Sequence, residues 1–343
     1  MKYYAAQRNL ALLGACCVFL SAVEFMFPKP LPFLRLGLAN LPLLLALRLP
    51  ALPFLELVLV KLAAQALVSG TLFSYTFVFS LAGTAVSASL MFVLRRIFPL
   101  RLLSCVGISA AGALGSNIIQ IILARYLVLG RQALLIMPPV LASGLVSGVA
   151  LGVFCERFMR ASRWYAELDM DAACYKQDRL SKLPLSKKPR VKTVFRFLIL
   201  LALSVLTLWM PWTSGKLILF VLSIFAAIYA KRLGSPFIML MFFLFIVFFN
   251  LLTPYGRLLL EIGAFKLTLG ALETGVSKAA AVEALLLFSR AFMPREITLP
   301  GRFGSLLAEV FARLDRLTAE KNNFKFRDGI AGLDALLLRC RDE

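Results

Sequence analysis

The sequence predicts an all-α, polytopic membrane protein, and three observations lead to this fold class. Hydrophobic residues make up 60% of its 343 positions, the mean hydropathy is +0.85, and long apolar runs alternate with short basic clusters. Soluble domains are about half apolar, whereas a spanning helix needs about 20 mostly apolar residues. We therefore expect a six-helix membrane bundle, then a second helical membrane domain, and cytoplasmic amphipathic helices at the end.

A polar, basic segment at residues 157–192 fixes the expected orientation. It holds ten Lys or Arg residues against four acidic ones, and an excess of positive charge keeps short loops on the cytoplasmic side. The net charge of +20 has the same explanation, because the basic residues cap apolar runs. We therefore expect membrane lipid around the helices and no nucleic-acid partner.

Six spans are expected before this segment, from apolar runs that end at breakers or basic residues. Pro28, Pro30 and Pro32 end the first run, because alternate prolines remove backbone donors and disfavour helix in the residues before them. Arg95 and Arg96 close the fourth run on the cytoplasmic side. The expected spans are residues 9–27, 36–49, 53–68, 71–94, 102–129 and 133–154.

Three further spans are expected after the basic segment, at residues 194–210, 216–230 and 236–252. Residues 258–292 mix charges with apolar residues, so we expect one tilted span followed by a helix at the cytoplasmic interface. From residue 294 on, an apolar stripe at helical spacing predicts an amphipathic helix that lies on the membrane surface or docks on a partner. The stripe consists of Leu306, Leu307, Val310, Phe311, Leu314 and Leu317.

The chain therefore divides into four expected parts. They are the six-span bundle at residues 1–156, the cytoplasmic linker at 157–192, the second membrane domain at 193–293, and the amphipathic helices and tail at 294–343.

Small residues spaced by four predict where helices approach closely in a bilayer. Gly144, Gly148 and Gly152 repeat at this spacing in the sixth span, and Ala11 and Ala15 do so in the first. We expect the glycine face to pack against a neighbouring helix of the same bundle.

Polar side chains at membrane depth are costly and usually face a cavity or one another. Asn117 and Gln120 lie three residues apart, so they share a helix face. We expect a pocket in the outer half of the bundle that offers amide groups to a small ligand. Equally open is the alternative that these side chains only bond to neighbouring helices. The candidate pocket residues are Glu24, Arg35, Asn40, Lys61, Gln65, Asn117 and Gln120, with Arg125 as a further polar residue of the fifth span.

Catalytic and cofactor signatures are missing from the sequence. The chain has no histidine, so imidazole-based catalysis is excluded. It has no phosphate-binding G-x-x-x-x-G-K-[ST] loop, no D-D-x-x-D pair for magnesium diphosphate and no G-x-S-x-G elbow. Its six cysteines form no C-x-x-C pair. We therefore expect no catalytic residue, metal or cofactor in this chain.

The run P-L-P-F-L-R-L-G-L-A-N at residues 30–40 resembles the hallmark of a bacterial membrane family, the Gx transporter family, also labelled heptaprenyl diphosphate synthase component I. Further matches are S-L-A-G at residues 80–83 and G-I-S-A-A-G-A at 107–113, followed by Asn117 and Gln120. The family's pattern has histidine where this chain has Ser116. The resemblance implies a multi-pass protein of the bacterial cytoplasmic membrane, with linker and C-terminus in the cytoplasm.

This family is similar to the six-helix substrate-binding subunits of energy-coupling-factor transporters, in which an A-x-x-x-A motif meets a coupling subunit. Ala11 and Ala15 fit that motif. Residues 193–320 more weakly resemble the coupling subunit itself, through G-A-F-K-L-T-L-G-A-L at residues 263–272, Ser289-Arg290 and Thr298-Leu299-Pro300. The resemblance assigns coupling roles to Ala11, Ala15, Thr298, Pro300 and Arg313, although the Ala-Arg-Gly signatures that grip ATPases are missing.

Three hypotheses follow. The leading one is a transporter component that captures a small solute in the first bundle and couples to separate ATPase subunits through the second half. The alternative, from the older family label, is a membrane accessory component of a heptaprenyl diphosphate synthase. The third is a membrane scaffold whose bundle is fully packed and holds no ligand.

Overall fold

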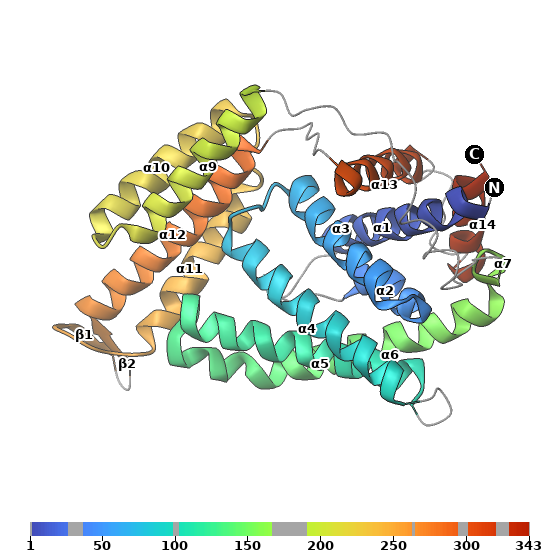
Figure 1. Cartoon of the computed structure of the whole chain (residues 1–343). Helices are drawn as coiled ribbons and strands as arrows, with labels where there is room; N and C mark the ends of the chain where they lie inside the picture. Colours follow the sequence, from blue (N-terminus) through green and yellow to red (C-terminus); the bar gives the residue numbers. More distant parts are fainter. Residues whose placement is uncertain are drawn as a thin grey trace.

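The computed structural model is all-α apart from one short hairpin (Figure 1). It describes residues 2–26, 37–98, 103–166, 191–262, 265–293, 301–319 and 329–342. The first half contains α1 (Lys2–Met26), η1 (Leu38–Asn40), α2 (Leu41–Leu45), η2 (Ala46–Arg48), α3 (Ala51–Ser69), α4 (Tyr75–Ile97), α5 (Cys105–Ala124), η3 (Arg125–Leu129), η4 (Gly130–Ile136), α6 (Met137–Ala161) and α7 (Arg163–Ala166). The second half contains α9 (Val191–Trp209), α10 (Thr213–Tyr229), α11 (Pro236–Leu251), β1 (Leu258–Ile262), β2 (Phe265–Thr268), α12 (Leu269–Phe292), α13 (Gly301–Ala319) and α14 (Gly329–Asp342).

Three helical stretches of the described chain are long and apolar enough to cross a membrane. They are residues 51–69, 75–97 and 105–161, and the last contains α5 and α6 folded back on each other. Shorter apolar helices include residues 9–24 of α1, residues 195–209 of α9, and all of α10 and α11. The predicted class, an all-α membrane protein, is therefore confirmed.

The second expected span, at residues 36–49, is wrong. The described part of this segment is broken into η1, α2 and η2, which together cover only residues 38–48. At about 1.5 Å per residue, this length falls well short of the roughly 30 Å of a bilayer core. Pro42 lies in the first turn of α2, where η1 gives way to α2, and Pro50 separates the piece from α3.

Local sequence sets the ends of the long helices. The Ser74 hydroxyl accepts a hydrogen bond from the Phe77 amide at 3.4 Å and so caps the start of α4. The Ser104 hydroxyl does the same for α5, at 3.3 Å from the Gly107 amide. Helix α3 ends at Gly70, whose φ of 61° is a left-handed conformation that favours glycine.

The glycine face of α6 packs against α5, as the spacing predicts. A Cβ atom placed on Gly152 would lie 2.4 Å from the Cα of Val106, and one on Gly148 would lie 3.0 Å from the Cα of Ala110. Because these neighbours are backbone atoms, any larger residue would force the two helices apart. The close approach gives dispersion contacts, which replace the hydrophobic effect as the force that holds helices together in lipid.

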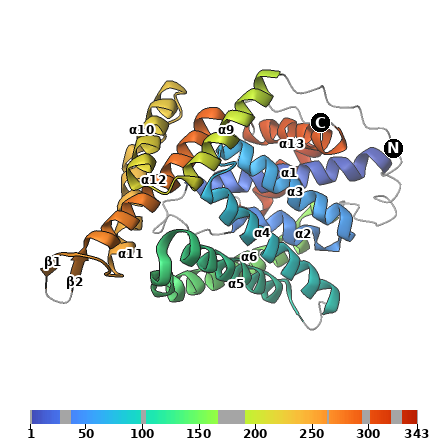
Figure 2. The same cartoon turned by 60° about the vertical axis from the view of Figure 1, so that its left-hand side comes forward.

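Helices α9 to α12 form a second bundle, inclined to α1 and α3 of the first (Figures 1 and 2). Residues 258–262 and 265–268 do not begin a tilted span as expected. They form the antiparallel hairpin β1–β2, in which Leu260 pairs with Leu267. Only α12 remains helical, and its Ala-rich middle is buried against α10 and α11. Small side chains there let three helices approach one another.

The apolar stripe of α13 docks on the chain's own first helix. Leu306, Leu307 and Val310 are buried in one core with Ala11 and Ala15. A Cβ on Gly14 would lie 3.0 Å from the Cγ2 of Val310, so the two helices lie in close contact. The sequence led us to expect this stripe on the membrane surface or on a partner, and the structure instead packs it against α1 of the same chain. Its partner is intramolecular.

The two halves meet at ends that the sequence places on opposite sides of the membrane. The fourth run is expected to end inside, at Arg95 and Arg96, so the α3–α4 connection at its other end is expected outside. The end of α12 is expected at the cytoplasmic interface. In the structure the Ser289 hydroxyl of α12 donates a hydrogen bond to the carbonyl of Leu72 in that connection. A Cβ on Gly70 would lie 3.4 Å from the Cα of Arg290. The α3–α4 connection and the end of α12 therefore lie on the same side of the molecule, so the two expected sides cannot both be correct in this arrangement.

Candidate functional site

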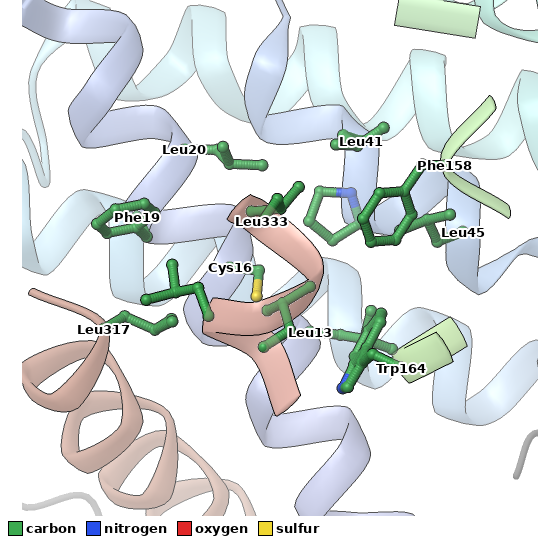
Figure 3. A pocket seen from close by; sticks show the side chains of 13 residues that line it. Leu13, Cys16, Phe19, Leu20, Leu41, Leu45, Phe158, Trp164, Leu317 and Leu333 are labelled. Carbon is green, nitrogen blue, oxygen red and sulfur yellow. The ribbon is translucent and has the colours of Figure 1, made fainter. Parts of the chain in front are cut away.

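A small apolar pocket lies between α1, α2 and the C-terminal helices (Figure 3). Its volume is about 20 Å³, and Leu13, Phe158 and Leu333 are among the side chains around it. A cavity needs about 10–15 Å³ and several polar partners to hold one water molecule. This pocket is therefore a packing gap that α13 and α14 close, not a ligand site.

A second cavity, of about 860 Å³, lies between the two halves of the chain. Its walls come from α1, α3, α4, α5 and α6 on one side, and from α11, α12 and the loop before α11 on the other. Its volume falls in the range of about 300–1,000 Å³ that is typical of sites for small molecules and cofactors. It is the candidate functional site.

The structure brings most of the predicted pocket residues to this cavity. Arg35 lies outside the described residues, and Arg125 is exposed and lies away from the cavity. The role of the others in binding remains a prediction. The predicted residues that line the cavity are Glu24, Asn40, Lys61, Gln65, Asn117 and Gln120.

Lys61 provides a buried cation in the first half of the cavity. Its side chain is 2% exposed, and its ammonium donates a hydrogen bond to the side-chain oxygen of Asn40 at 2.5 Å. Glu24, at 5% exposure, lines the same cavity. Charged groups at membrane depth are costly and often mark a ligand or ion site. This part of the cavity therefore suits a ligand with polar groups.

The side-chain amides of Asn117 and Gln120 bond within the protein and also leave atoms facing the cavity. Asn117 donates to the carbonyl of Val140 at 2.8 Å, and Gln120 donates to the Ser116 hydroxyl at 2.9 Å. The first bond joins α5 to α6, and the second lies within α5. Their side-chain carbonyl oxygens accept no hydrogen bond from any residue the structure describes, and both side chains line the cavity. The acceptors are thus available to a ligand.

Sequence reasoning missed the charged residues that the second half adds. Arg232, Glu283 and Arg290 line the cavity, and Glu283 is 1% exposed. The signal was present, since Glu283 lies within the run A-A-A-V-E-A-L-L-L-F at residues 279–288. An ionisable residue in such a run is a functional candidate by default. It was passed over because the pocket was expected within the first bundle alone.

Apolar side chains line both halves of the cavity, and α11 contributes aromatic and aliphatic ones. Phe242, Phe245 and Ile246 line the cavity opposite the polar residues of the first half. Within the described ranges, no group of three or more His, Cys, Asp or Glu side chains gathers to hold a metal ion. The arrangement fits binding of an amphiphile, with polar groups for a head and aromatic and aliphatic side chains for a tail.

The residues expected to act in coupling lie elsewhere. Ala11 and Ala15 are fully buried beneath α13, and Arg313 is buried on α13 with Glu309 3.9 Å away. Thr298 and Pro300 lie outside the described residues. The Ala11 face therefore contacts a helix of the same chain.

Comparison with known families gives two matches. Residues 13–158, from α1 to α6, match the family "Heptaprenyl diphosphate synthase component I". Residues 188–294, which include α9 to α12, match a family described as a domain of unknown function. No curated protein and no solved structure matches the chain. The first half of the chain is thus similar to a family named after polyprenyl synthesis.

Proposed function

We propose that this chain is the membrane-embedded accessory component of a heptaprenyl diphosphate synthase, and that its cavity holds a prenyl-chain amphiphile. The observation that carries the proposal is the cavity of about 860 Å³, whose lining combines charged and amide side chains with aromatic and aliphatic ones. A prenyl diphosphate has the matching division, an anionic head on a long hydrocarbon tail.

The division of the lining supports this ligand class. Lys61 and the amides of Asn117 and Gln120 offer polar contacts on the side of the first half. Phe242, Phe245 and other side chains of α11 offer apolar area, and each buried CH₂ of a ligand contributes about 0.8 kcal/mol. An amphiphile uses the polar and the apolar lining at once, whereas a small polar solute leaves the apolar lining without a partner.

The chemistry of chain elongation belongs to a separate catalytic subunit in this proposal. The sequence carries no D-D-x-x-D pair to hold magnesium diphosphate for catalysis. The membrane component would bind the growing or finished product, which becomes too hydrophobic for water as its tail lengthens. The family name that matches residues 13–158 supports a synthase as the partner.

A second candidate, solute capture for an ATPase-driven transporter, is favoured by one observation. The Ala11–Ala15 face, which resembles a coupling motif, is covered by α13 of the same chain. A chain that carries both a capture bundle and its coupling helix would show this contact. Co-purification with ATPase subunits in mild detergent supports this candidate, and their persistent absence counts against it.

The proposed function is tested by prenyl elongation with the catalytic subunit, with and without this chain in lipid nanodiscs. We expect this chain to raise product yield or length, and prenyl lipid to co-purify with it by mass spectrometry. The variant Thr84→Trp fills the cavity from α4 and should remove both effects. Val93→Trp, on the exposed face of the same helix, is the matched control. Unchanged elongation and no bound prenyl lipid would refute the proposal.

A further inference from the structure

Two oppositely charged side chains of α12 line the cavity and attract each other without forming a close ion pair. Glu283 and Arg290 lie seven residues apart, or two helical turns, so they share one face of the helix. No ion pair within 4.0 Å joins them in the part of the chain that the structure describes. Each of these groups can therefore accept a ligand.

Burial of the Glu283 carboxylate costs more free energy than burial of the Arg290 guanidinium, because one of its oxygens lacks a hydrogen-bond donor. The residue is 1% exposed, and its Oε2 atom is buried with no hydrogen-bond donor among the described residues. A buried carboxylate oxygen that lacks a donor costs free energy unless a proton, cation or ligand satisfies it. Because Glu283 lines the cavity, the missing group can enter from there.

The backbone of Arg290 is fixed by hydrogen bonds from Arg232, and these bonds do not occupy the Arg290 guanidinium. Arg232 donates hydrogen bonds to the carbonyls of Arg290 and Met293, at 2.9 and 2.6 Å, and ties the loop before α11 to the end of α12. Gly234 in that loop has a φ of 76°, and a Cβ there would lie 2.8 Å from Nη1 of Arg290. The left-handed φ favours glycine at this position, and the guanidinium lies directly beside it. No described residue accepts a hydrogen bond from that guanidinium, although Arg groups pair readily with phosphate.

We propose that Arg290 and Glu283 form the headgroup site of the cavity, which binds a diphosphate together with a divalent cation. The guanidinium of Arg290 binds phosphate oxygens. The cation, Mg²⁺ in the cell, bridges the diphosphate to the Glu283 carboxylate. One carboxylate suffices because Mg²⁺ is commonly held by one or two carboxylates together with substrate phosphates and water. The inference rests on the proposed function and adds that the second half of the chain recognises the head.

The test measures binding of geranylgeranyl diphosphate to the full chain in phosphatidylcholine nanodiscs, with Mg²⁺ or with EDTA. We expect wild-type affinity to fall at least tenfold in EDTA. Glu283→Gln should bind equally weakly in both conditions, while Glu283→Asp, which keeps the carboxylate, should keep the Mg²⁺ dependence. Arg290→Gln should weaken binding in both conditions, and Arg290→Lys should restore part of it.

Controls separate the headgroup site from the fold and from the tail. Glu273→Gln lies on the same helix at an exposed position and should bind as wild type. Inorganic diphosphate with Mg²⁺ should compete with the prenyl ligand. Farnesol lacks the diphosphate, so its affinity should be the same with Mg²⁺ and with EDTA. Size-exclusion profiles identify variants that fail to fold, and for those the Asp and Lys variants carry the test.

The outcomes are distinct. If the prenyl diphosphate binds but neither EDTA nor any variant of Glu283 or Arg290 changes the affinity, the headgroup lies elsewhere and this inference is wrong, while the proposed function stands. If no prenyl diphosphate binds at all, the proposed function fails with it. Binding that depends on Glu283 but not on a divalent cation would also overturn the inference, because it would indicate a ligand with its own positive charge.

Discussion

The Asp334 carboxylate of α14 accepts a hydrogen bond from the hydroxyl of Ser162, the residue between α6 and α7. It also accepts from the backbone amides of Arg163, at 3.2 Å, and Trp164, at 3.0 Å. A side chain from the last helix thus caps α7, and it fixes the C-terminal end of the chain to the first bundle.

Removing this cap should loosen α14. We expect Asp334→Ala to cost about 0.5–2 kcal/mol, as for other lost helix caps, and to speed proteolysis within α14 in a limited-digestion time course. Asp315→Ala, at an exposed position of α13, is the control and should digest as wild type. Equal digestion rates for both variants would mean that the cap does not hold the helix.

The close contact between α5 and α6 predicts a strong glycine effect. Gly152→Ala should lower the melting temperature by several degrees, because its Cβ would meet the Val106 backbone at 2.4 Å and overpacking costs about 1–3 kcal/mol. Gly115→Ala should be tolerated, since its nearest neighbours are side-chain atoms of Leu90 and Val86. Thermal melts of both variants in detergent give the comparison. Similar melting temperatures would contradict the helix packing described.

The Lys61–Asn40 hydrogen bond predicts coupling between two sites 21 residues apart. Hydrogen bonds to charged groups contribute about 1.5–3 kcal/mol, so a double-mutant cycle with Lys61→Met and Asn40→Ala should show a coupling energy of that order. A cycle of Asn40→Ala with Lys216→Met, which lies outside the cavity, should show additivity. Additive effects in the first cycle would show that the Lys61–Asn40 hydrogen bond does not contribute to stability.

Docking of α13 on α1 predicts opposite effects of the same substitution at Val310 and at Ala308, two nearby residues of α13. Val310→Glu places a charge in the core beside Gly14 and should detach α13, because an unpaired buried charge is costly. Ala308→Glu lies on the exposed face and should leave the contact unchanged. Cysteine cross-linking between α1 and α13 reports the contact. Cross-linking that persists in Val310→Glu would show that the apolar stripe does not hold the helix.

Patterns that depend on neighbours in sequence were predictable. The spacing of Gly144, Gly148 and Gly152 predicted a packed helix face, and α5 occupies it. Apolar length predicted residues 53–68 and 71–94 as helices, and α3 and α4 differ from these ranges by only a few residues at each end. The first inference uses the helical period and the second the length of an apolar run, and neither needs a contact between distant parts of the chain.

Features that depend on tertiary contact were not predictable from one sequence. The stripe around Val310 indicated an apolar partner but did not identify α1. Glu283 and Arg290 belong to a helix that seemed separate from the pocket, and only the packing of α11 and α12 against the first bundle places them in the same cavity. The hairpin at residues 258–268 was mistaken for part of a span because apolar runs of this length fit strand and helix alike.

The central claim is that both halves of the chain enclose a prenyl-chain amphiphile, and photo-cross-linking tests it most directly. A geranylgeranyl diphosphate analogue with a diazirine in its tail is bound to the full chain in nanodiscs, irradiated and mapped by peptide mass spectrometry. The account predicts labels on cavity-lining residues of both α4 and α11, such as Phe79 and Phe242, and their loss in Thr84→Trp. Labels confined to exposed, lipid-facing residues such as Leu198 and Ile218 would contradict it.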